Sequence, residues 1–148
     1  DADHWLNVWA DSRLTEDRYI KAVETKPSAG AYRVVHHVAT SMRWEEEDGK
    51  EGGGFLNEYA VGKNADKYPE GTGKILEANS RVRFSFHYHS VGEEVTDQTE
   101  LGLVLYPEGF EPDHILYSRQ LAQAGEGGAD GGLGGKQSRQ TFRSRAQN

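Results

Sequence analysis

Short runs in which apolar and polar residues alternate make up most of the chain. The clearest run is residues 81–89, where Phe84, Phe86 and Tyr88 occupy every second position. Side chains alternate between the two faces of a strand, so these aromatic side chains share one face, which we expect to be buried. Similar runs predict strands at residues 18–24, 33–40, 55–61 and 100–106, and residues 5–9 also alternate.

Turn residues separate these runs. Glycine, proline, asparagine, aspartate and glutamate gather at residues 26–30, 45–54, 64–66, 68–71, 91–93 and 107–109. The acidic run 45–48 is expected in a solvated loop, and the glycines at 52–54 in a loop or hairpin. No long segment repeats apolar residues at the helical period. Many short strands with such turns predict an all-β fold, an antiparallel β-sandwich of the jelly-roll kind.

The length and the glycine content predict one domain followed by a tail. The chain has 148 residues, and residues 1–124 form the expected sandwich domain. Residues 125–135 are rich in glycine, which indicates a flexible linker or an adaptable surface loop. Residues 136–148 carry four basic residues and no acidic one. We expect residues 125–148 to be a flexible tail, and the alternative is that the basic part is an arm that orders on an acidic partner.

Charge and composition exclude several classes of function. The net charge is −7, and the four charges of the basic segment mean that the remainder carries −11. An acidic body argues against nucleic acid as the main partner. The absence of cysteine excludes disulfides, thiolate metal sites and thiol catalysis. No stretch approaches the ~20 apolar residues of a transmembrane helix, so we expect no transmembrane segment. Because the chain begins at Asp1, we expect it to be processed, excised or partial.

Four histidines lie on two of the predicted strands. His36 and His37 are adjacent, whereas His87 and His89 share the polar face of residues 81–89. Adjacent strand residues face opposite sides, so His36 and His37 can reach one metal ion only near a strand end, at an edge or beside a bulge. Three imidazoles suit copper or zinc. The spacing alone leaves two interpretations open, a metal site and ordinary surface histidines.

Several motifs, met in this order along the chain, carry a resemblance to a known family. They are residues 17–27 (DRYIKAVETKP), 34–37 (VVHH), 59–63 (YAVGK), 68–73 (YPEGTG), 83–88 (RFSFHY), 91–97 (VGEEVTD) and the strand 101–106. The chain resembles the first, copper-binding domain of the copper type II, ascorbate-dependent monooxygenases, in particular the bacterial relatives of peptidylglycine and dopamine monooxygenases. The resemblance covers roughly residues 15–120.

The resemblance implies a site and a location. His36, His37 and His87 match the ligands of the family's electron-transfer copper, and zinc is the alternative ion. His89 matches no ligand, and three roles stay open for it: orienting a ligand from behind, substituting for a ligand, or being a polar surface residue. We assign no catalytic residue. A periplasmic or extracellular location follows from the resemblance alone.

The chain departs from the family after its first domain. The family's second domain holds the oxygen-activating copper through a His-x-His pair and a methionine, but no histidine or methionine follows Gln123. We therefore expect a copper-binding redox domain that is incomplete as a hydroxylase and needs a protein partner or a missing second domain. The alternatives are a metal carrier, or a non-catalytic structural or accessory subunit of a larger extracytoplasmic assembly. The missing second domain, the N-terminal Trp5 and Trp9 and the unusual tail favour the structural subunit.

The remaining candidate residues have simpler interpretations. His4 and His114 match no ligand motif and are expected at the surface. Met42 is expected to pack in the core. Asp97 and Glu100 are expected to supply turn hydrogen bonds or to orient a histidine.

Overall fold

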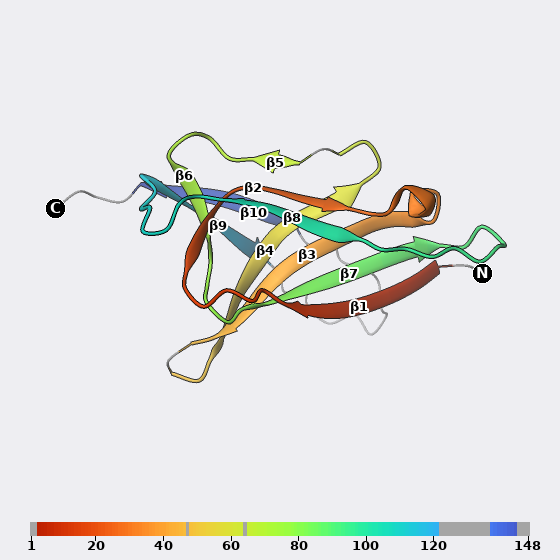
Figure 1. Cartoon of the computed structure of the whole chain (residues 1–148), viewed down its shortest axis with the longest axis horizontal. Helices are drawn as coiled ribbons and strands as arrows, with labels where there is room; N and C mark the ends of the chain where they lie inside the picture. The colour runs from red at the N-terminus through yellow and green to blue at the C-terminus, as the bar shows by residue number, and fades with distance from the viewer. Residues whose placement is uncertain (1–2, 47, 64, 122–136, 145–148) are drawn as a thin grey trace, which may run out of the picture.

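The fold is an all-β sandwich of two sheets (Figure 1). The computed structural model describes residues 3–46, 48–63, 65–121 and 137–144. In these residues the single helical element is the short 3₁₀ helix η1, Ala29–Ala31, which confirms the predicted fold class. None of the described helices is long and apolar enough to cross a membrane.

The first sheet has four strands in the order β1-β7-β3-β4, all antiparallel. The second sheet runs β10-β9-β6-β2-β5, and β8 also pairs with β2. Its pairings are antiparallel except for the parallel pair β6–β9. The strand bounds are β1 Asp3–Asp11, β2 Arg18–Lys26, β3 Val35–Glu45, β4 Glu51–Ala60, β5 Asp66–Lys67, β6 Thr72–Leu76, β7 Arg81–His89, β8 Glu100–Leu105, β9 His114–Leu121 and β10 Gln137–Ser144.

The core lies between the sheets and has two parts. Apolar side chains from β2 and β6 meet those from β3, β4 and β7 in the larger part. The smaller part lies near η1, where Val35 and Val38 of β3 pack with Phe86 of β7. The buried positions of β7 are Val82 and Phe86, with Phe84 and Tyr88 partly buried. The apolar face predicted for residues 81–89 is therefore confirmed.

The sequence located most strands but misplaced one turn. The glycines at 52–54 lie inside β4, and not in the connection between β3 and β4, because that turn is completed by residues 46–50. A Cβ atom on Gly52 would overlap the Trp44 indole, and one on Gly53 would overlap Arg43 and the Met42 carbonyl. Glycine therefore lets two large side chains of β3 lie across the neighbouring strand, which turn statistics do not anticipate.

Part of the predicted tail belongs to a sheet. Within the basic segment, residues Gln137–Ser144 form β10, which pairs antiparallel with β9 along its whole length. The glycine-rich run 125–135 lies outside the described residues. The strands β5, β6 and β9 were not predicted either, because β5 has two residues and the other two lack a clear alternation of apolar and polar residues.

Candidate metal centre

A bulge in β3 brings the two adjacent histidines to one face. Val35 pairs with Tyr88 and His37 pairs with His87, so His36 is the extra residue in β3. Val35 and Val38 are both buried, although a regular strand would place them on opposite faces. The bulge resolves this conflict and turns both His36 and His37 outward. Two adjacent strand histidines can share an ion only at a bulge, an edge or a strand end, and β3 has a bulge at this position.

Three imidazole nitrogens converge on the outer face of the first sheet. His36 Nδ1 lies 3.2 Å from His37 Nδ1 and 3.2 Å from His87 Nδ1. One ligand atom from each of the three lies within 4.8 Å of the others. Two nitrogens bound to one tetrahedral ion at about 2.0–2.1 Å would lie about 3.3 Å apart. The spacing in the protein therefore fits a single metal ion.

Hydrogen bonding alone does not satisfy the cluster. A neutral imidazole nitrogen carries either one proton or one lone pair in the ring plane, so His36 Nδ1 can complete only one of its two 3.2 Å contacts. The other nitrogen pair then lies at 3.2 Å without a hydrogen bond, which is unfavourable. A cation between the rings would instead accept all three lone pairs. Among the described residues this is the one group of three or more His, Cys, Asp or Glu side chains that is placed to hold a metal.

The start of β1 forms one wall of the cluster. Trp5 lies opposite His87 in the β1–β7 register and stacks on its ring, with centroids 4.0 Å apart and an interplanar angle of 6°. Its indole also meets His37 edge-on at 5.5 Å. Asp3 lies opposite His89, and its Oδ1 is 2.8 Å from His89 Nδ1. Figure 1 shows the start of β1, the start of β3 and the end of β7 together at one end of the sandwich.

Local electrostatics favour the neutral form of His37. Burial lowers the pKa of His37, and the neighbouring imidazoles of His87 and His36 lower it further against the opposing charge of Glu58. Neutral imidazoles are the form that binds metal. The hydrogen bond from His89 holds the pKa of the Asp3 carboxyl below its ordinary value. Burial of His37 therefore favours the form that binds metal, and the Asp3 carboxyl beside His87 and His89 is held in its charged form.

The other candidate residues lie away from the convergence point. His89 is outside the cluster and contacts it through Asp3. His114 is exposed at the start of β9, and His4 is exposed on β1. Met42 is 4% exposed and packs in the core, as predicted. Asp97 accepts hydrogen bonds from the Ser28 backbone and the Tyr88 hydroxyl and none from a histidine, so it supports a loop.

The contacts of Asp3 and Trp5 with the histidines were not predicted from the sequence. Trp5 was expected to pack or to contact a partner, and Asp3 was not singled out. Their alternation, two residues apart, would have placed them on one face of a strand. The pairing of β1 with β7, which brings them to His87 and His89, joins segments more than 70 residues apart and leaves no local signal.

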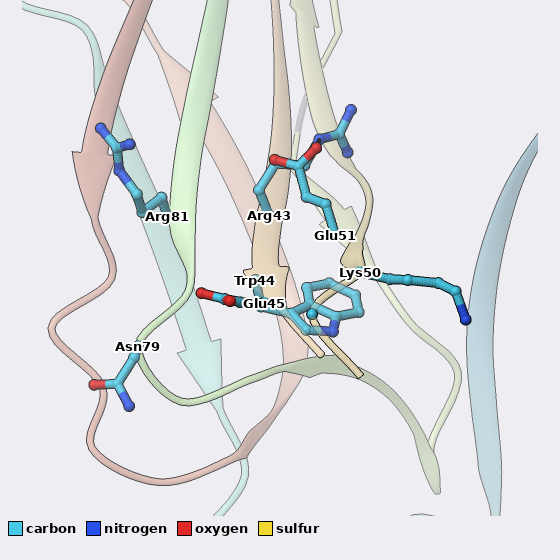
Figure 2. A pocket seen from close by; sticks show the side chains of 8 residues that line it. Arg43, Trp44, Glu45, Lys50, Glu51, Asn79 and Arg81 are labelled. Atoms are coloured by element: carbon cyan, nitrogen blue, oxygen red, sulfur yellow. Dashed lines mark ion pairs between the residues drawn. The ribbon is translucent and has the colours of Figure 1, made fainter. Parts of the chain in front are cut away.

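A hollow lies at the end of the same sheet opposite to the three histidines. It is a cavity of about 390 Å³ beside the β3–β4 turn, and Figure 2 shows Arg43 and Arg81 above the Trp44 indole. The two arginines are paired in the register of β3 and β7, and their guanidinium groups point away from each other. Each has an acidic neighbour, since Arg43 Nε lies 4.0 Å from Glu51 and Arg81 Nε lies 3.4 Å from Asp11. The charges are balanced there, and no metal-binding group forms.

Comparison with known proteins returns no assignment. No protein-family model matches the chain, and no curated protein matches it. The geometry of the three histidines is therefore the main basis for a functional proposal.

Proposed function

We propose that this chain is a copper-binding redox domain that holds one copper ion through His36, His37 and His87. The observation that carries the proposal is the position of His36 Nδ1, which lies 3.2 Å from both His37 Nδ1 and His87 Nδ1, in a group whose three ligand atoms all lie within 4.8 Å of one another. The resemblance to the electron-transfer half of the copper monooxygenases favours copper over zinc, which three imidazoles also suit. Copper, when bound, would accept and release one electron.

The residues around the site are suited to holding an ion in a fixed geometry. Both histidines of β3 and His87 of β7 are anchored on paired strands with buried neighbours, so their backbones move little when an ion binds or changes charge. His36 is exposed, which leaves one side open to solvent or to a partner. Trp5 covers the opposite side.

Hydroxylation would need a second site. In the part of the chain that the structure describes, no second cluster of His, Cys, Asp or Glu side chains comes together. We infer that oxygen activation takes place on a protein partner or on a further domain, in a periplasmic or extracellular setting. No catalytic residue is assigned to this chain.

Elemental analysis of the purified chain tests the metal directly. We expect about one copper per chain after loading with Cu²⁺, and loss of that copper in the double variant His36→Ala, His87→Ala. The double variant His4→Ala, His114→Ala is the matched control, because both residues are exposed histidines outside the cluster. Retention of zinc in preference to copper would favour a metal carrier. Absence of metal from the loaded wild type would refute the proposal.

A structural subunit is the second candidate, and the exposed apolar residues of β1 favour it. All nine residues of β1 are exposed, among them Trp5 at 62%, Leu6 at 49%, Val8 at 43% and Trp9 at 40%. The strand pairs with β7 on one side and ends the sheet on the other. An apolar edge strand is a template for pairing with another chain. This candidate needs no metal between the histidines.

A further inference from the structure

The ring nitrogen of His87 that faces away from the cluster lacks a hydrogen bond. Its Nε2 is buried from solvent, and Asp3 Oδ2 lies 3.5 Å away, longer than a normal hydrogen bond. If Nδ1 binds a metal, the proton of the neutral ring must be on Nε2. A buried N–H without an acceptor is costly, so the Asp3 carboxylate is the group that would satisfy it.

Asp3 is already oriented for this contact. His89 Nδ1 lies 2.8 Å from Asp3 Oδ1, which leaves Oδ2 directed at His87. His87 and His89 are two residues apart on the same face of β7, so one carboxylate reaches both rings. A short movement of Asp3 would convert the 3.5 Å contact into a hydrogen bond.

Trp5 restricts the plane of the same ring. Its indole is within 6° of parallel to the His87 imidazole at 4.0 Å, and its edge contact limits His37 at 5.5 Å. Although Trp5 is 62% exposed, its stacked face is occupied by a ligand residue. Asp3 and Trp5 thus act on one ring from two directions, through its nitrogen and through its face.

We propose that β1 is the positioning strand of the metal centre, in which Asp3 holds His87 as the Nε2–H tautomer and Trp5 fixes the plane of its ring. The inference rests on the proposed metal-binding function. Asp3 and Trp5 are positioning residues, because neither is placed to touch the ion. A carboxylate hydrogen-bonded to the far nitrogen of a ligand histidine raises the basicity of that ligand, and loss of such a partner typically weakens metal binding about 10–100-fold.

A metal-free measurement tests the tautomer. Long-range ¹H–¹⁵N NMR spectra of the imidazoles at pH 8, recorded on the full chain without metal, report which nitrogen of His87 carries the proton. We expect Nε2–H in the wild type and a mixture of tautomers in Asp3→Ala. A wild-type ring protonated on Nδ1, or identical His87 signals in both proteins, would overturn the assignment to Asp3 whether or not copper binds.

Copper affinity tests the consequence. Competition with a chelator should give Cu²⁺ binding about 10–100-fold weaker in Asp3→Ala, and weaker in Trp5→Ala with recovery in Trp5→Phe. The matched controls are Asp11→Ala and Trp9→Ala, which remove the same groups from the same face of β1 but contact Arg81 instead.

The outcomes separate the two proposals. If the wild type binds copper and the Asp3 and Trp5 variants bind it equally well, the positioning role is refuted while the proposed function stands. If the wild type binds no copper, the proposed function fails, and the NMR spectra still decide whether Asp3 fixes the His87 tautomer. Weakening by the Asp11 and Trp9 controls to the same extent would show a general effect of β1 and would also overturn the specific role.

Discussion

At the scale of single residues, Lys74 is the largest side chain that the sandwich buries completely, at 1% exposure. Its ammonium group donates hydrogen bonds to the Phe55 carbonyl of the first sheet and to Ser118 Oγ of β9, at 2.9 Å for Ser118. Burial lowers the pKa of Lys74 to about 8, against a smaller opposing effect of Asp66. This lysine therefore joins the two sheets and makes their stability depend on pH.

We predict that the free energy of unfolding rises with pH from about 8 to about 10. In that window the unfolded chain, with an ordinary lysine pKa of 10.5, binds more protons than the folded chain, so stability increases with pH. The rise should be about 2 kcal/mol between pH 7 and pH 10, from 1.36 kcal/mol per pKa unit. Denaturant unfolding at several pH values measures it.

The variant Lys74→Met should remove this rise, and Lys67→Met, which changes an exposed lysine on β5, should keep it. Above pH 10 a second effect opposes the rise. Burial raises the pKa of Tyr68 and Tyr88, so these tyrosines lose their protons first in the unfolded chain, which lowers the free energy of unfolding. Equal pH slopes in the wild type and in Lys74→Met would show that Lys74 is not the cause.

At the scale of elements, the sequence of β1 is nearly symmetric about Asn7. An antiparallel pair of two β1 strands centred on Asn7 would place Trp5 opposite Trp9 and Leu6 opposite Val8. Apolar residues would meet apolar residues on both faces, and shifting the centre by one residue would place Trp5 opposite Asn7 or Asp11. Cross-strand pairs of this kind stabilise a sheet.

We therefore predict that the structural-subunit candidate assembles as a dimer through β1. Sedimentation velocity should show concentration-dependent dimers of the wild type, and the double variant Leu6→Lys, Val8→Lys should weaken them at least about tenfold, since lysine on an edge strand opposes pairing. Val104→Lys is the control, because Val104 is also an exposed apolar strand residue, at 55%, but lies on β8. A monomeric wild type would remove the support for this candidate.

At the scale of the whole molecule, metal binding and folding should be linked. The three ligands come from segments about 50 residues apart, and only the folded sheet brings them together. An ion that binds the folded chain alone stabilises it by about 2.7 kcal/mol at a free concentration 100 times the dissociation constant. Copper should therefore raise the midpoint of thermal unfolding.

We predict that this stabilisation disappears as the pH falls from 7 to 5. Protons compete with the metal for imidazole nitrogens, and the lowered pKa of His37 keeps that ring free of a proton to a lower pH. Thermal unfolding with and without Cu²⁺ measures the effect. The variant His36→Ala, His87→Ala should show no copper-dependent shift at either pH, and a shift that persists in it would place the ion elsewhere.

The alternation of apolar and polar residues predicted strands correctly where one face of the strand is buried. The alternation of residues 81–89 predicted β7 with its bounds and its apolar face, because burial forces side chains of one kind to every second position. The adjacent pair His36-His37 was informative for a different reason, because neighbouring strand residues face opposite sides and could share an ion only at an irregularity. The burial of both Val35 and Val38, which a regular strand would place on opposite faces, was found only in the structure.

The all-β class and most of the strands could be predicted from the sequence. So could the requirement that His36 and His37 lie at an irregularity if they are to share an ion. These follow from short-range sterics and burial, which act between neighbours in the chain. Only the tertiary structure decided that the irregularity is a bulge opposite His87, and that β1 brings Asp3 and Trp5 against the same ring. Strands from distant segments pair through backbone hydrogen bonds, which are the same for every residue type. The local sequence therefore says little about which strands will pair.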